Sequence, residues 1–159
     1  MVLEAEQFWQ DSNAEYQREG VKAACLWLQN EKGLNVNLLL LICWIAKQGV
    51  ELSPNELEEI LAAIANWHDQ NISLIRQLRK ATEAATWMDT TRKEQLKQKL
   101  LDSEITMERI EQQLMIEQLN RLPLKTKPNA SAEQSFCNYL LLKHLALDEE
   151  IQAKFGQLL

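Results

Sequence analysis

The stretch Leu34–Ala46, LNVNLLLLICWIA, decides the fold that this sequence can adopt. Its last nine residues, Leu38–Ala46, carry no polar group except a thiol and an indole N–H. A helix that is apolar on every side has to be enclosed by protein or by lipid. Nine residues are too few to cross a bilayer, which takes about 20. We therefore expect this segment to be the central helix of a bundle whose other helices cover it.

The composition is that of a globular chain with a sizeable core. The 159 residues are 46% hydrophobic, and a domain of this length buries roughly 70% of its unfolded surface. The net charge of −6 argues against nonspecific binding to nucleic acid or to anionic membranes. Residues 61–100 nevertheless contain seven bases and four acids. This basic middle either meets an acidic partner or is a solvated helix face.

The remaining sequence reads as helix, because no stretch alternates apolar and polar residues with period 2. We predict an all-α fold, a compact bundle of six to seven helices around the apolar central helix. Ser53–Glu56 is a capping box with proline at the first helical position, and neither glycine nor proline follows until Pro123. Asn35 and Ser131 are suitable N-caps for the helices that follow them, and Thr91–Glu94 resembles a second capping box. One domain is expected, with N-terminal helices in 3–50, a long helical hairpin in 53–121 (helices to about Ala85 and from about Thr91), a loop at 122–130 and C-terminal helices in 131–159.

The three cysteines, Cys25, Cys43 and Cys137, lie far apart inside apolar runs. We expect buried free thiols in a reducing cytoplasm, with a disulfide or a zinc site as the alternative. The first residues are acidic and lack a basic region followed by an apolar one, so we expect no signal peptide and a cytoplasmic location.

Polar side chains interrupt the apolar stripe that we predict for the helix beginning at Ser53. The stripe contains Leu57, Ile60, Leu61, Ile64, Trp67, Leu74, Ile75 and Leu78, and at 100° per residue His68, Asn71 and Arg79 fall on the same side. Polar groups on a core-facing stripe need partners. The following helix offers Glu104, Glu108 and Glu111. Three interpretations stay open. The first is a ligand pocket with His68 as acid or base and Arg79 as anion holder, the second is a satisfied structural network, and the third is a helix whose far half emerges into water.

Sequence signatures of catalysis are missing. The two histidines, His68 and His144, fit neither a Glu-x-x-His nor an H-E-x-x-H metal pattern, and the chain has no glycine-rich phosphate loop and no G-x-S-x-G. We therefore expect no metal site and no cofactor, assign no catalytic residue, and favour a protein that is not an enzyme. DNA binding is disfavoured because the apolar helix after Gly33 cannot present polar side chains to base edges.

Five tryptophans are many for this length. They either pack in the core or include one or two surface anchors, since tryptophan is enriched at protein interfaces. The candidate interaction surface combines the basic segment with the tryptophans most compatible with exposure: Trp27, Arg76, Lys80, Trp87, Arg92 and Lys93, with Arg79 also in that segment.

A combination of short motifs marks the first half of the chain. They are Phe8-Trp9, Ser12, Tyr16, Gly20-Val21, ACLWLQ at 24–29, Gly33, VNLLL at 36–40, WIA at 44–46, and Trp67 followed by Leu78-Arg79. This pattern resembles an uncharacterised family of proteobacterial proteins of similar length, from which the chain departs at Asn35 (Asp in the family) and His68 (Arg). The second departure argues against a catalytic His68. The resemblance implies a bacterial, cytoplasmic, helical protein and carries over no functional residue.

Two hypotheses for the function follow. The first is a non-enzymatic adaptor or regulator that binds another protein through a helical face. The second is a small-ligand-binding protein or enzyme with a polar pocket at His68, Asn71 and Arg79. We expect no nucleic acid and no membrane span, and the sequence leaves open whether a second copy is the partner.

Overall fold

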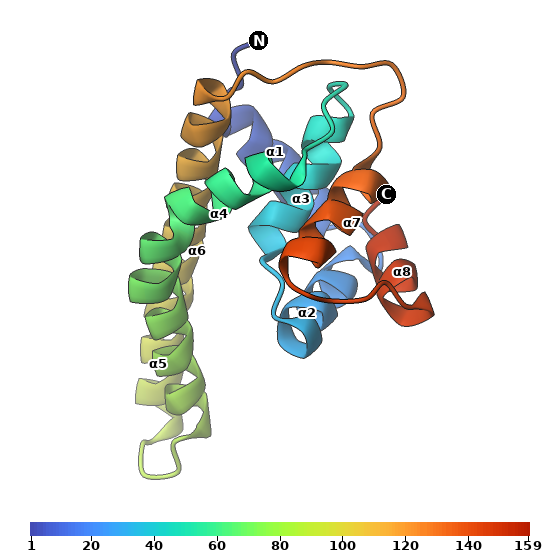
Figure 1. Ribbon diagram of the computed structural model, residues 1–159. Coiled ribbons are helices and arrows are strands. Elements are labelled where there is room, and N and C mark those ends of the chain that lie inside the picture. Colours follow the sequence, from blue (N-terminus) through green and yellow to red (C-terminus); the bar gives the residue numbers. More distant parts are fainter.

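The apolar run forms the centre of the molecule. The computed structural model describes residues 1–159, and the run becomes α3 (Val36–Ala46). Asn35 caps this helix, since its side-chain oxygen accepts a hydrogen bond from the backbone N–H of Leu38 at 3.0 Å. All nine residues of 37–45 are buried, and Figure 1 shows α3 among α1 (Ala5–Tyr16), α2 (Val21–Lys32) and α7 (Ala132–Leu142). The prediction of an enclosed central helix is confirmed.

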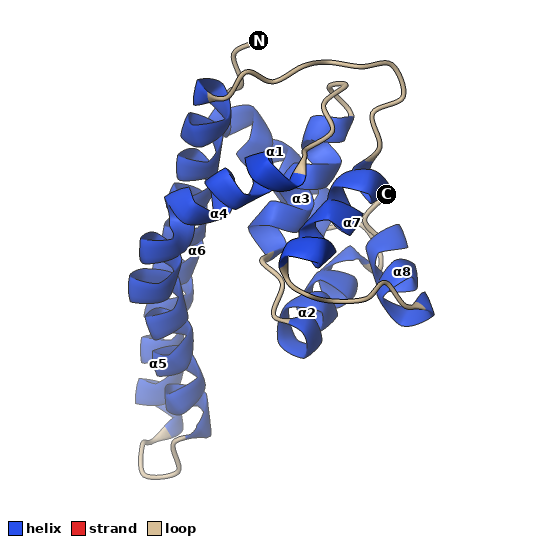
Figure 2. Cartoon of the chain, in the orientation of Figure 1, coloured by secondary structure: helices blue, strands red, loops and turns tan.

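Helices make up the fold, as Figure 2 shows. Three consecutive elements form one continuous rod: α4 (Pro54–Trp67), η1 (His68–Ile72) and α5 (Ser73–Ala84). Counted as one, this rod and the other six helices make seven separate helical rods. The predicted all-α bundle is confirmed. The extended backbone pairs only in an isolated bridge between Val50 and Thr126. No helix is both long enough and apolar enough to cross a membrane.

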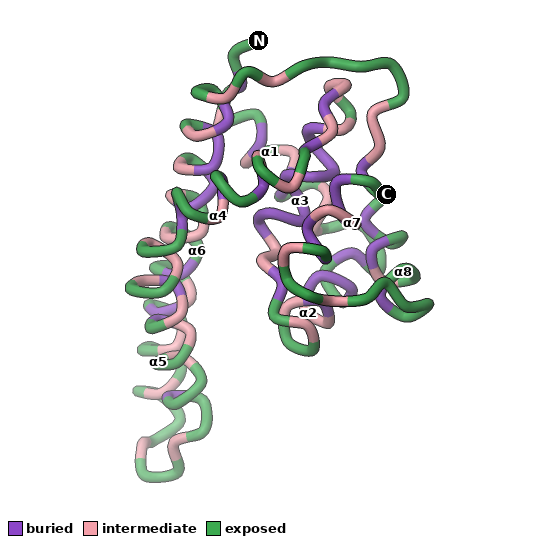
Figure 3. Tube along the Cα trace, viewed as in Figure 1, coloured by how far each residue is buried: buried purple, intermediate pink, exposed green.

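The hairpin extends well beyond the bundle. Ser53 and Glu56 form the predicted capping box at the start of α4. The returning helix α6 (Thr90–Arg121) has 32 residues, about 48 Å at 1.5 Å per residue, and its cap is Asp89 rather than the expected Thr91. In Figure 1 α5 and the first half of α6 project together away from the other helices. We call residues 73–101 the arm; Figure 3 shows that most of its surface is exposed.

A π-helical turn, η1, interrupts the rod that the sequence predicted to be an unbroken α-helix. The turn holds one extra residue, which rotates all later side chains by about 100° relative to a regular α-helix. Ile72, Ile75 and Thr82 are therefore buried, whereas Leu74 and Leu78 are 55% and 52% exposed. The predicted apolar stripe is wrong at Leu74 and Leu78.

The C-terminal helices close the core. Ser131 caps α7, as predicted, and Asp148 caps α8 (Glu149–Gly156). Phe136 of α7 stacks on Phe155 of α8 with ring centroids 3.9 Å apart, and α8 also packs against α2. A single cluster of 30 buried apolar residues extends from Leu3 to Leu158.

The cysteine side chains are all free thiols. Cys25 and Cys43 are buried, as expected, while Cys137 is half-buried. Burial raises the pKa of Cys25 and of Cys43 to about 12. Since the thiolate is the reactive form, these two thiols are unsuited to nucleophilic chemistry at neutral pH.

Candidate functional site

The side of α6 that faces the rest of the molecule carries a row of polar residues. Glu104, Glu108, Glu111 and Gln112 recur at spacings of three and four, which places them on one face of the helix. In the arm, this face meets arginines of α5; nearer the bundle it meets η1, α3 and α1. The row therefore connects the arm to the centre of the bundle.

Ion pairs form the arm end of the row. Glu104 accepts hydrogen bonds from Arg79 Nε at 2.7 Å and from Arg76 Nε at 3.2 Å, and Arg76 Nη2 also donates to Glu108 at 3.0 Å. The Glu104 side chain is only 8% exposed and both arginines are 19% exposed. Its hydrogen bond to Glu104 raises the pKa of Arg79, whereas burial raises the pKa of Glu108. The seam between α5 and α6 therefore contains these ion pairs in addition to the buried side chains of Ile75 and Leu100.

Glu111 is the centre of the bundle end of the row. One carboxylate oxygen accepts from His68 Nδ1 at 2.7 Å, and the other accepts from the side-chain amides of Asn35 and Asn37, both at 3.0 Å. Burial by itself raises the pKa of Glu111, but these three hydrogen bonds outweigh it and the pKa is lowered below the ordinary 4.5. Glu111 is thus an ionised, fully engaged carboxylate in the interior.

The network continues through Gln112 to the first helix. Its Nε2 donates to the Ser12 hydroxyl at 3.1 Å and to Asn37 Oδ1 at 2.9 Å. Sequence reasoning missed Ser12, Asn37 and Gln112 as members of the site. A signal did exist in Asn37, because a polar residue in the first turn of an otherwise apolar, enclosed helix must find a buried partner.

The residues of the expected pocket do not all gather in one place. Arg79, Glu104 and Glu108 border a cleft between the arm and the bundle, while His68 borders a neighbouring shallow pocket. Asn71 is half-buried, borders neither space, and its side chain forms no hydrogen bond with the protein. His68 is instead bonded to Glu111, and Arg79 to Glu104, both on α6.

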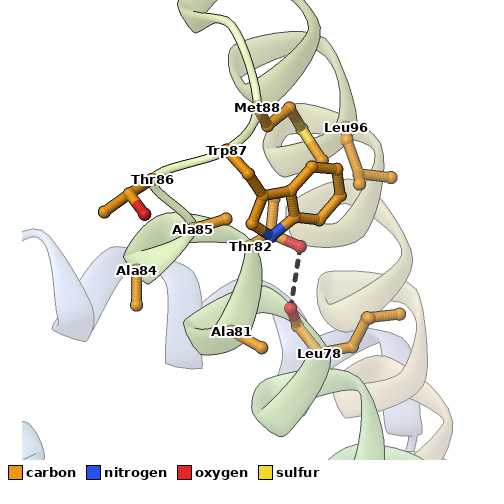
Figure 4. A pocket seen from close by; sticks show the side chains of 9 residues that line it. All are labelled: Leu78, Ala81, Thr82, Ala84, Ala85, Thr86, Trp87, Met88 and Leu96. Atoms are coloured by element: carbon orange, nitrogen blue, oxygen red, sulfur yellow. Dashed lines mark hydrogen bonds between the residues drawn. The ribbon is translucent and has the colours of Figure 1, made fainter.

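The loop at the end of the arm presents an exposed tryptophan. Trp87 is 82% exposed, and it lines an apolar hollow that Figure 4 shows in detail. The indole lies beside Thr82, Met88 and Leu96, and the Thr82 hydroxyl is turned to the Leu78 carbonyl at 2.9 Å. The tip therefore offers apolar surface that nothing in the molecule covers.

The other residues of the expected interaction surface fall into four places. Arg92 lies beside Trp87 at the tip, where it pairs only with Asp89 and its side chain stays 82% exposed. Lys93 follows it in the chain and donates to the Glu83 carbonyl. Lys80 is exposed at the cleft. Arg76 is held by glutamates in the seam, and Trp27 is half-buried on α2 beneath the ammonium groups of two lysines, Lys32 and Lys154.

No group of three or more His, Cys, Asp or Glu side chains is arranged to hold a metal ion. Glu104, Glu108 and Glu111 of α6 instead accept hydrogen bonds from arginines, a histidine and side-chain amides.

Residues 7–115 match the model of the family DUF2390, described as "Protein of unknown function". The chain belongs to this family. The matched region runs from α1 through most of α6, so it contains the arm and the polar row and stops before α7 and α8. No curated protein and no solved structure shows significant similarity to the chain. Because the family description gives no activity, the function has to be argued from the geometry.

Proposed function

We propose that this protein is a non-enzymatic adaptor that binds an acidic protein partner through the tip of the arm. The observation that carries the proposal is the 82% exposure of Trp87 at the end of a two-helix projection. Exposing an indole to water is costly, since full burial of a large apolar side chain is worth about 1.5–3 kcal/mol. Tryptophan is also the residue type most enriched among the anchors of protein interfaces.

Charge favours an acidic partner. The arm contains seven bases and three acids, whereas the rest of the chain contains ten bases and twenty acids. At the tip, Arg92 lines a hollow together with Trp87, and the ammonium of the next residue, Lys93, donates to the Glu83 carbonyl at 3.1 Å. An acidic rim around an apolar socket on the partner would match this surface, and the opposite charges would speed the encounter.

The polar groups give less support to an enzyme or to a ligand pocket at His68. Its Nδ1 is bound to Glu111, and Arg79 is bound to Glu104. A reactant would have to compete with Glu104 for Arg79, whereas His68 keeps a second ring nitrogen, Nε2, that forms no hydrogen bond in the protein. We also propose that the protein acts in the bacterial cytoplasm, because buried free thiols are the ordinary state of cysteines in that reducing compartment.

Site-specific photo-crosslinking tests the proposal. A photoreactive amino acid replaces Thr86, the exposed neighbour of Trp87, in one variant and Leu141 in the control, because Leu141 is 65% exposed on α7, outside the arm. Both proteins keep Trp87 and are irradiated in lysate of the source organism. We expect an acidic protein to be captured from position 86 and not from position 141.

Binding of the purified partner then provides the decisive measurement. Trp87→Ala and the double variant Arg92→Glu/Lys93→Glu should each weaken binding at least about tenfold, and Leu141→Ala should leave it unchanged. Equal capture from both positions, or a captured protein that binds Trp87→Ala as well as the unaltered chain, would refute the proposal. If only a second copy of this chain is captured, the adaptor proposal is wrong and the tip of the arm is a contact between copies of this protein.

A further inference from the structure

A cleft of about 570 Å³ separates the arm from the bundle. Helices α1 and α2 and the start of α3 form one wall, and α5 with the middle of α6 forms the other. Its volume lies within the range of small-molecule sites, roughly 300–1,000 Å³. Trp87 does not border the cleft, so it is a different place from the tip of the arm.

Gln112 supplies the cleft with a buried acceptor that has no partner. The residue is 1% exposed, and its Oε1 receives no hydrogen bond in the protein. Turning the amide over would not help. Asn37 has to direct its Nδ2 at Glu111, so its Oδ1 faces Gln112 and requires Nε2 there. The unsatisfied Oε1 is therefore imposed by the network.

An unpaired buried acceptor typically costs about 1–3 kcal/mol. A ligand that carries an N–H or O–H donor would offset this cost. Because Oε1 has almost no accessible surface, the side chains that separate it from the cleft would have to move aside to admit the donor. The Tyr16 hydroxyl borders the same space, and because burial raises the pKa of Tyr16 to about 12, it stays protonated and able to donate. Trp9 and Leu26 add aromatic and apolar wall on the bundle side.

Free positive charge remains at the cleft after its ion pairs are counted. Arg76 and Arg79 are paired with Glu104 and Glu108. Lys22 and Lys80 also border the cleft, are exposed, and form no ion pair. The two uncommitted ammonium groups favour a ligand with negative charge.

We propose that the cleft binds a small organic anion that bears hydroxyl or amino donors. The donor would bond to Gln112 Oε1, and the phosphate or carboxylate would be held by Lys22 and Lys80. This site is independent of the adaptor surface, and either proposal can fail without the other.

Titrations with matched probes test the donor and the anion separately. Three probes carry both an anionic group and hydroxyl or amino donors: ribose 5-phosphate, adenosine monophosphate and gluconate. Ribose and adenosine are controls without the anionic group, and sulfate is a control without the donor. Calorimetry measures affinity, and the side-chain amide resonance of Gln112 in nitrogen–proton NMR spectra reports contact at the buried acceptor. We expect at least one of the first three to bind and shift this resonance, with each control weaker by tenfold or more.

Exposed-residue variants keep the test separate from folding. The double variant Lys22→Gln/Lys80→Gln should weaken binding at least about tenfold. The control is Lys99→Gln/Lys125→Gln, which changes two exposed, unpaired lysines outside the cleft and should leave binding unchanged. Ile105→Trp should abolish it, because Ile105 is 51% exposed at the border of the cleft. If none of the three probes shifts the Gln112 resonance, or if sulfate binds as tightly as they do, the proposal is wrong.

Discussion

The bundle and the arm are stabilised in different ways. In α3, nine of eleven residues are buried, and helices cover it on several sides. In the arm, only three of the 29 residues of 73–101 are buried, namely Ile75, Thr82 and Leu100, along one seam reinforced by arginine–glutamate pairs. Figure 3 shows the contrast between the buried interior of the bundle and the exposed arm.

This difference separates stability from surface function. The free energy of folding should reside in the bundle, where apolar area is removed from water. The arm contributes little burial, yet it carries exposed apolar side chains and positive charge. A change in α3 should therefore unfold the molecule, and a change at the tip should leave it folded.

The largest effect is expected for Leu41→Asp. Leu41 is completely buried in α3, and an unpaired carboxylate there would cost about 5 kcal/mol or more, comparable to the total stability of many domains. Circular dichroism should show loss of cooperative thermal unfolding. Leu141→Asp is the control, since Leu141 is 65% exposed and should change stability by no more than about 0.5 kcal/mol. Similar melting of both variants would mean that α3 is not enclosed.

Glu111→Ala should have the next largest effect. The change removes the carboxylate that accepts from His68, Asn35 and Asn37, and leaves Asn37 Nδ2 with only the Glu108 carbonyl at 3.3 Å. Breaking a buried charged network of this kind costs about 3–5 kcal/mol. Urea denaturation measures the loss.

Glu111→Gln separates charge from hydrogen bonding at the same position. The amide oxygen can still accept from both asparagines, so we expect a smaller loss than for alanine. Because the folded pKa of Glu111 is lowered from 4.5, the charge stabilises the fold above that pH, and this contribution disappears as the pH falls through the folded pKa. The difference between Glu111→Gln and the unaltered chain should therefore shrink below pH 4.5. A difference that grows in acid would contradict this assignment.

Features that depend on local sequence could be predicted. The central helix followed from its apolar run, and the helix starts at Asn35, Ser53 and Ser131 followed from capping residues whose hydrogen bonds involve only neighbours in the chain. The hairpin followed from the absence of glycine and proline over the long segment after Pro54. Each of these predictions needed no knowledge of packing.

Features that depend on packing could not be predicted. The π turn adds one residue without any local sequence signal, so the sequence placed Leu78 on the wrong face of its helix. The bond between Asn37 and Glu111 requires the register of α3 against α6, because the two residues are 74 positions apart in the chain. The orientation of the Gln112 amide, with its unpaired Oε1, depends on that same bond. The sequence therefore could not indicate the cleft that Gln112 borders.

A local effect is expected for Glu104→Ala. The variant removes the partner of Arg76 and Arg79 in the seam, and hydrogen bonds to charged groups are worth about 1.5–3 kcal/mol. Hydrogen–deuterium exchange should accelerate in the arm about tenfold or more, while the amides of α3 stay protected. Glu94→Ala is the control, because Glu94 is exposed and forms no ion pair. If α3 exchanged faster by the same factor as the arm, the two regions would not be separable.

The smallest effect on stability is expected for Trp87→Ala. An 82% exposed side chain loses little on truncation, so the free energy of unfolding should change by no more than about 0.5 kcal/mol. Trp44 is only 7% exposed and packs against Phe8 in the core. Trp44→Ala should therefore lower the free energy of unfolding by about 3–5 kcal/mol. Fluorescence distinguishes the two positions independently, since the emission lost with Trp87 should be that of a water-exposed indole and the emission lost with Trp44 should be shifted to the blue. A blue-shifted contribution from Trp87, together with a loss above about 1 kcal/mol, would mean that the indole is packed onto the arm and is not free to bind a partner.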